Sequence, residues 1–171
     1  MQRTVRRKDR RIDEDEAWGV LRRCNWGVLS TVGPDGWPYG VPLNYCLDER
    51  GPDKALIFHV AREGRKLDSL RHCPRASFVA VEGAEMLPDK FSTAYASALV
   101  EGEVAILDDP DAKRAALSFF VESLAPAYRE RGVKHIEYRL THCFVLRLTI
   151  AGITGKGRKK SEPYALAHLG F

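Results

Sequence analysis

Six short runs rich in β-branched and aromatic residues limit the fold of this chain more than any other feature. They span 26–32, 39–47, 55–60, 76–82, 97–107 and 142–153, and each has the length and composition of a β-strand. The first two runs flank GPDG at 33–36, a sequence that suits a type I turn, so we expect them to form a hairpin. Pro42 lies inside the second run and predicts an edge strand or a bulge there.

Helical patterns fall between some of these runs without alternating strictly with them. We predict helices from Asp13, at 64–73, from Asp108 to Leu124 and at 133–140. This order argues against a doubly wound parallel sheet. It favours a mainly β fold, a closed or split antiparallel barrel with six strands and peripheral helices. Between the predicted strands, 83–96 reads as a long functional loop, and 155–163 as a basic flexible tail.

The length of 171 residues fits one domain that buries a real core. We place that domain at 1–156, with a C-terminal tail at 157–171. No apolar run approaches the roughly 20 residues needed to cross a bilayer, and the N-terminal segment lacks the apolar stretch of a secretory signal. We therefore expect no membrane association and a cytoplasmic protein.

The four cysteines and the charged N-terminal arm point to no special chemistry. Cys24, Cys46, Cys73 and Cys143 include no CxxC pair, so we expect buried apolar thiols and no metal site. Six of the first eleven residues are Lys or Arg, but an acidic run at 13–16 follows at once. A solvated arm, or one that packs on a partner subunit, is expected rather than nucleic-acid binding.

The segment HVAREGRK at 59–66 is the strongest candidate for a binding site. A helix that begins near Gly64 leaves its first N–H groups unpaired, and glycine lets a ligand approach the backbone. Arg65 and Lys66 add two cations beside the positive end of the helix dipole. This arrangement predicts an anion site for a phosphate, although a solvated basic helix start has the same spacing. No GxSxG, GxGxxG or GxxxxGK[ST] motif supports a serine hydrolase, a Rossmann fold or a P-loop.

Several segments together resemble a known family. WGVLSTVGPDGWPYGVPLNY, IFHVAREGRKLDSLRHCPRASF, YASALVEGEVAIL and ITGK are similar to the Nim-type 5-nitroimidazole-resistance proteins. These belong to the pyridoxamine 5′-phosphate oxidase-like superfamily of FMN-binding split barrels. The resemblance covers most of the chain, and VPLNY, FH-x4-G-x-K and S-x3-EG carry it in combination. It implies a six-stranded split barrel that forms a homodimer with two FMN molecules at the subunit interface.

The resemblance also implies roles for individual residues. Arg65 and Lys66 correspond to the cations that hold the FMN phosphate, and His59 and Val60 to strand residues that line the cofactor. The strand beside the isoalloxazine ring corresponds to Val41, Pro42, Leu43 and Asn44. Ser97 corresponds to a polar residue that reaches the cofactor from another strand. We expect backbone N–H groups of Val41 and Leu43 to bond the ring edge, because Pro42 has none.

His59 is the candidate catalytic residue, on the substrate side of the flavin. The substrate-gripping C-terminal segment of true pyridoxamine 5′-phosphate oxidases has no clear match in this chain, so vitamin B6 oxidation is not expected. The leading hypothesis is an FMN-dependent oxidoreductase. It takes electrons from reduced nicotinamide or another donor and passes them to a small organic acceptor such as a nitroaromatic. The alternative is a protein that holds FMN or haem without turnover, with His59 as an axial haem ligand.

Overall fold

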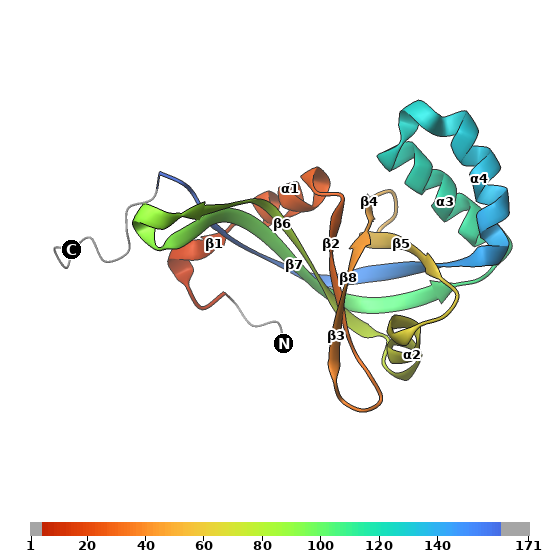
Figure 1. Cartoon of the computed structure of the whole chain (residues 1–171), viewed down its shortest axis with the longest axis horizontal. Coiled ribbons are helices and arrows are strands. Elements are labelled where there is room, and N and C mark those ends of the chain that lie inside the picture. The colour runs from red at the N-terminus through yellow and green to blue at the C-terminus, as the bar shows by residue number, and fades with distance from the viewer. Residues whose placement is uncertain (1–4, 162–171) are drawn as a thin grey trace.

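A computed structural model describes residues 5–161 as one curled antiparallel sheet with helices packed around it (Figure 1). The strands are β1 Arg11–Ile12, β2 Trp26–Val32, β3 Pro38–Asn44, β4 Cys46–Asp48, β5 Ala55–Ala61, β6 Arg75–Leu87, β7 Ser92–Leu107 and β8 Cys143–Arg158. The helices are α1 Glu14–Arg23, α2 Arg65–His72, α3 Pro110–Leu124 and α4 Arg129–His142, with short 3₁₀ turns at Lys8–Arg10, Pro88–Lys90 and Pro126–Tyr128. No helix in this part of the chain is both long and apolar enough to cross a membrane.

The order of the strands explains why the sheet curls into a half-barrel. It runs β3-β2-β6-β7-β8-β5-β4, with the short β1 paired to β8. The two edge strands β3 and β4 are separated in sequence by Tyr45 alone, so the chain itself links the opposite edges. The expected mainly β split barrel with peripheral helices is confirmed. The sheet has eight strands rather than six, because β1 adds a strand and Tyr45 divides the run predicted at 39–47.

Tyr45 breaks that run because its side chain belongs to the core. The ring is 1% exposed and packs edge-on against Phe78, with ring centroids 4.9 Å apart. Its hydroxyl donates a hydrogen bond of 2.8 Å to the backbone carbonyl of Leu21 in α1. A buried tyrosine keeps such a partner because an unpaired buried hydroxyl is costly. This anchor holds the corner where β3 leaves one edge of the sheet and β4 joins the other.

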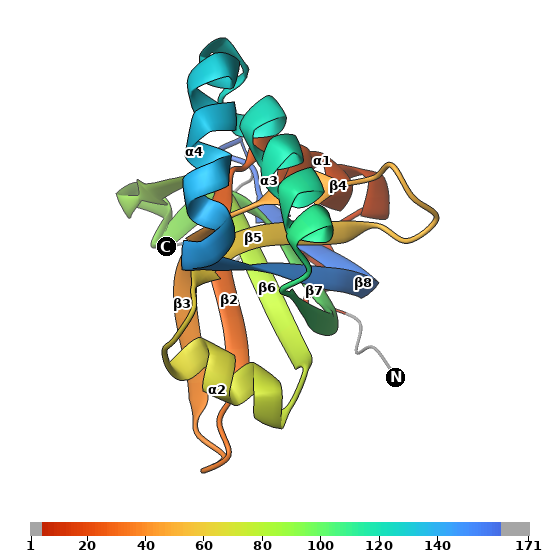
Figure 2. The same ribbon diagram turned by 90° about the vertical axis from the view of Figure 1, so that its right-hand side faces the viewer.

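Two apolar clusters stabilise the fold on opposite sides of the sheet. The larger fills the concave side and contains Leu29, Phe58, Phe78, Val100 and Leu146, with α1 and α2 closing it. The smaller lies between the outer side of β5 and β8 and the α3–α4 hairpin. In Figure 2 this hairpin stands on one side of β5 and β8, while α2 lies below, near β3. The hairpin therefore covers only part of the outer surface of the sheet.

The N-terminal part of the chain folds largely as its sequence predicts. The Asp13 carboxylate accepts a hydrogen bond of 2.7 Å from the Glu16 N–H, the expected cap of α1. Before it, Arg11 and Ile12 pair with Lys156 and Gly155 of β8. The end of the basic arm therefore packs on the arm's own subunit.

The predicted loop at 83–96 is wrong. There β6 and β7 continue as a paired ribbon, joined by the short turn at Pro88–Lys90, and this ribbon extends away from the barrel (Figure 1). Most residues at the far end of β6 are exposed, so the sequence lacks the alternation between buried and exposed residues that identifies a half-buried strand. The ladder shifts register between Glu82 and Glu85, where Gly83 has φ 61°, the conformation of a glycine β-bulge.

The C-terminal strand also exceeds its prediction. β8 continues through Arg158 and pairs with β7 along its length, so 155–158 is not part of a flexible tail. A register shift between Glu101 and Gly102 marks a bulge in this ladder. A Cβ at Gly102 would lie 1.9 Å from the Thr149 carbonyl oxygen, which explains the glycine. The tail predicted at 157–171 lies largely outside the described residues.

Candidate functional site

The turn between β5 and α2 exposes backbone donors beside two cations. Gly64 caps the helix with φ 119°, a conformation that L side chains rarely adopt. Its carbonyl accepts hydrogen bonds from the N–H groups of Leu67 and Asp68. The N–H groups of Arg65 and Lys66 lie in the first turn, where a helix has no partner of its own to offer. The start of α2 therefore has the donors that an anion needs.

The side chains of Arg65 and Lys66 add charge at the same place. The Arg65 guanidinium lies 4.9 Å from the ring centroid of Tyr39 in β3, which brings the start of α2 against that strand. Arg65 is exposed and Lys66 is half-buried. Among residues 5–161 neither forms an ion pair within 4 Å. Two neighbouring cations without a counter-charge form a local positive potential that a phosphate would neutralise.

Arg62, the third cation of the segment, has a structural role instead. Its guanidinium donates hydrogen bonds of 3.0 and 3.3 Å to the Asp108 carboxylate and lies 4.2 Å from the ring centroid of Phe144. Asp108 also accepts a hydrogen bond of 3.0 Å from Lys113, whose side chain is 2% exposed. Arg62, and then Lys113, hold the pKa of Asp108 below its usual value. This ion-pair triad ties the loop before α2 to the start of α3.

The backbone of β3 is oriented by its ladder with β2. At the hairpin turn the Gly33 N–H donates to the Trp37 carbonyl at 3.0 Å, and at the other end the Tyr45 N–H donates to the Asn25 carbonyl at 3.1 Å. The register between them is unbroken. In an antiparallel pair, hydrogen-bonded and non-hydrogen-bonded residues alternate. The odd-numbered residues of β3 therefore direct their N–H and C=O groups to β2.

This ladder corrects the expected donors to the flavin ring. The N–H groups of Val41 and Leu43 face β2 and are used within the sheet. The groups that face the outer edge belong to Gly40, Pro42 and Asn44. Pro42 lies on an edge strand, as predicted. Its backbone nitrogen faces away from β2, so the missing N–H costs no hydrogen bond of the ladder. The edge of β3 thus offers Gly40 and Asn44 as its backbone donors.

His59 and Val60 point to opposite sides of β5. Val60 is 5% exposed and packs in the main core, so only its backbone can face a ligand. The His59 side chain remains exposed on the other side, where its ring meets Phe120 of α3 edge-on at 4.8 Å. Desolvation by the α3–α4 hairpin lowers the pKa of His59, and Arg139 and His135 lower it further. His59 is therefore a neutral imidazole at pH 7.

Ser97 lies apart from the start of α2 in a single chain. It pairs with Val81 of β6, six residues beyond Arg75 at the α2 end of that strand, a span of roughly 20 Å at ~3.3 Å per residue. Its hydroxyl donates a hydrogen bond of 2.9 Å to the Lys156 carbonyl. The structure therefore brings Arg65 and Lys66 together with β3 but does not add Ser97 from the same subunit.

An apolar row on the outer face of the sheet was not predicted from the sequence. Paired residues of neighbouring strands share a face, and Pro42, Val28, Val79 and Leu99 stand in register across β3, β2, β6 and β7. Gly40, next to the row on β3, has no side chain, and a Cβ there would lie 3.1 Å from Val28. The alternation of side chains within 26–32 and 97–107 shows which residues share a face of each strand. Only the register between strands shows that these residues stand side by side in one row.

The exposure of this outer face is unusual for apolar side chains. Trp26 is 55% exposed, Val81 43% and Leu99 39%, and all three come from the strands that form the row. Contiguous apolar surface of this kind marks a binding or association face. Ser97 lies directly opposite Val81 and so belongs to the same face.

The model of the pyridoxamine 5′-phosphate oxidase family matches residues 13–157 of the chain. The chain belongs to this family. Among solved structures, a conserved hypothetical protein from Mycobacterium tuberculosis is 20% identical, with 94% of each chain covered and a TM-score of 0.74. A flavocytochrome from Azotobacter vinelandii is 20% identical over 98% of this chain and 78% of its own, with a TM-score of 0.74.

A third similar structure is that of a protein from Bacteroides thetaiotaomicron VPI-5482, provisionally assigned to 5-nitroimidazole antibiotic resistance. It is 19% identical, covers 85% of each chain and has a TM-score of 0.67. At these identities the three structures establish the fold of a family member and no more. No curated protein matches the sequence.

Proposed function

We propose that this family member is an FMN-binding oxidoreductase that reduces a small organic acceptor. The observation that carries the proposal is the pair of unpaired cations, Arg65 and Lys66, beside free N–H groups at the start of α2. FMN ends in a dianionic phosphate, which such a site stabilises by charge-assisted hydrogen bonds. When bound, the flavin supplies the redox chemistry, so the protein needs only to bind, orient and shield it.

The outer face of β3 and β2 supports a place for the flavin ring. Arg65 contacts Tyr39 of β3, so the start of α2 lies beside this strand, with the Tyr39 ring on the inner side that Val41 and Leu43 share. Gly40 keeps the surface flat, and the apolar row beside it suits an aromatic ring system. We infer that the N–H groups of Gly40 and Asn44 bond the ring edge in place of those of Val41 and Leu43.

We also propose that the protein is a homodimer with its flavins at the interface. The exposed outer face favours a second copy, because Trp26, Val81 and Leu99 would otherwise stay in water. Ser97 shares this face but lies far from Arg65 in its own chain. If a second copy covers this face, Ser97 of one subunit can approach the flavin held by the other subunit.

His59 suits a role beside the acceptor. Its imidazole is exposed and neutral, and the edge-on packing on Phe120 fixes the ring plane. A neutral imidazole can donate a hydrogen bond from one nitrogen and accept one at the other. We propose that it orients the acceptor and holds a proton there. We further propose that the acceptor is a nitroimidazole. The sequence resemblance and the structural similarity to the Bacteroides protein support this choice.

Haem binding without turnover is the second candidate. The exposed neutral imidazole of His59 has the protonation state that iron ligation requires. The Azotobacter neighbour is a flavocytochrome, which adds support. The cation pair at α2 favours flavin over haem as the main cofactor, because it matches a compact dianion.

The absorption spectrum of the purified protein tests both candidates. We expect the two visible bands of an oxidised flavin, and a Soret band would instead favour haem. Reduced nicotinamide should bleach the flavin bands anaerobically, and a nitroaromatic compound should restore them. A colourless protein that takes up no FMN on dialysis against FMN would refute the proposal. A bound flavin that no donor reduces would instead indicate a protein that carries the flavin without turnover.

A further inference from the structure

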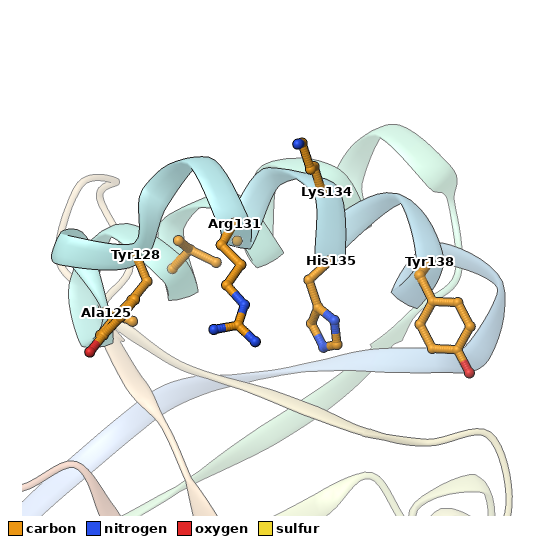
Figure 3. Close-up of a pocket in the computed structure, with 8 residues that line it drawn as sticks. Ala125, Tyr128, Arg131, Lys134, His135 and Tyr138 are labelled. Carbon is orange, nitrogen blue, oxygen red and sulfur yellow. The ribbon is translucent and has the colours of Figure 1, made fainter.

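A groove beneath α4 contains none of the residues of the proposed flavin site. It has a volume of about 780 Å³ and is lined by Val121, Ala125, Tyr128, Arg131, Gly132, Lys134, His135 and Tyr138. Figure 3 shows that Tyr128, Arg131, His135 and Tyr138 project from one side of the helix toward the strands, whereas Lys134 points away. Their spacing of three and four residues places these four side chains in a single stripe.

The helices pack closely enough to give the groove a fixed wall. A Cβ at Gly132 of α4 would lie 2.5 Å from a Val121 methyl carbon of α3, so only glycine permits this approach. Val121 and Ala125 form an apolar surface, with the exposed rings of Tyr128 and Tyr138 on either side. An aromatic ring of a ligand fits such a surface by stacking and apolar contact.

The charge of the groove is positive and unbalanced. In the described chain, Arg131 forms no ion pair, and no acidic residue lines the groove. Glu122 and Glu137 are the hairpin carboxylates that pair with other arginines, Arg129 and Arg114 respectively. A free guanidinium between two tyrosine rings is suited to bind a phosphate beside an aromatic group.

His135 adds a directed donor to this guanidinium. Its Nε2 accepts a hydrogen bond of 3.0 Å from the Arg139 Nε–H, so Nδ1 is the ring nitrogen that carries an N–H donor. Figure 3 shows the His135 ring on the groove side of α4. The groove therefore combines one cation, one oriented N–H donor and two aromatic rings.

The helices that form the groove also pack on His59, the side chain proposed for the acceptor side of the flavin. His59 packs on Phe120, the neighbour of Val121 in α3. His135 and Arg139 are also close enough to lower the pKa of His59. His59 therefore packs against the hairpin that forms the groove, while His59 and Phe120 themselves stand outside its lining.

We propose that this groove binds a nicotinamide dinucleotide as electron donor, with its diphosphate on Arg131 and His135 and its two aromatic ring systems against Tyr128 and Tyr138 at the two ends. This inference rests on the proposed flavin function and names the donor for it. A dinucleotide carries both features that the groove offers, an anionic diphosphate and flat rings. Inorganic pyrophosphate carries the charge alone and should bind more weakly.

Calorimetric titration of the purified flavoprotein with NADH and NADPH tests the assignment directly. We expect saturable binding of at least one of them, and at least about tenfold weaker binding in Arg131→Ala, the loss expected for one hydrogen bond to a charged group. Arg131→Lys should restore part of it. The matched control is Arg129→Ala, which removes the same charge from the same helix outside the groove and should leave affinity unchanged.

Three outcomes would overturn the inference: no saturable binding of either nucleotide, equal losses in Arg129→Ala and Arg131→Ala, or pyrophosphate binding as tightly as the dinucleotide. The flavin content of each sample, measured by absorbance, separates this result from the proposed function. Arg131→Ala should keep its full flavin. Flavin-free wild-type protein would contradict the proposed function, while the heat of nucleotide binding would still report on the groove.

Discussion

Loss of the Lys66 charge should weaken flavin binding in a way that a charge lost elsewhere on α2 does not. A hydrogen bond between charged groups contributes about 1.5–3 kcal/mol, which corresponds to a roughly 10- to 150-fold change in dissociation constant. Lys66 is half-buried and has no competing ion pair in the described chain. When the phosphate leaves, no other carboxylate replaces the lost interaction energy of the ammonium group. We expect Lys66→Ala to lose about tenfold, and Lys66→Glu to lose more because it repels the dianion.

The matched control is Arg71→Ala, which removes a cation from the last turn of the same helix. Arg71 pairs with Asp68 at 3.4 Å and lies about 9 Å along the helix axis from the first turn, at 1.5 Å per residue. Fluorescence titration of the flavin-free proteins with FMN gives each dissociation constant, and riboflavin, which lacks the phosphate, should bind all variants alike. Equal losses in Lys66→Ala and Arg71→Ala, or full retention of FMN by Lys66→Glu during gel filtration, would refute the phosphate assignment.

Four further outcomes are expected. His59→Ala should keep its flavin and lose acceptor reduction in steady-state assays, and unchanged turnover would remove this histidine from the mechanism. Tyr45→Phe should lower the free energy of unfolding by about 1–2 kcal/mol in urea, because a buried carbonyl loses its donor. Arg22 lowers the pKa of Glu49 to about 2 from 4.5, so stability from this pair is complete above pH 4.5 and lost toward pH 2; Glu49→Gln should flatten that acid limb in thermal melts. Leu99→Glu should yield monomers in light scattering, and a dimer of unchanged strength would exclude the outer face as the interface.

Local chemistry explains the elements that sequence reasoning located well. The Asp13 cap, the GPDG turn and the short helix after Gly64 each depend on residues within one turn of the chain. Such contacts form in the same way whatever the rest of the molecule does. Local patterns did not predict the ribbon beyond Glu82. It is stabilised by backbone pairing between β6 and β7 and not by a buried apolar face.

The candidate site divides along the same line. Arg65 and Lys66 are adjacent in sequence, so the sequence alone placed two cations at one helix start. The donors on β3 depended on which residues of that strand pair with β2, and a shift of one residue exchanges the inner and outer groups. Only the register showed that Val41 and Leu43 face the sheet, while Gly40 and Asn44 face its edge.

The amino-acid sequence by itself determined the strand-rich composition, the caps and turns, and the basic entry to α2, because each arises from neighbouring residues. The tertiary structure decided how Tyr45 links the two edges of the sheet, how four strands align an apolar row, and where His59 meets the α3–α4 hairpin. Those features join residues that are far apart along the chain. Their positions depend on packing of the whole core, which no local pattern records.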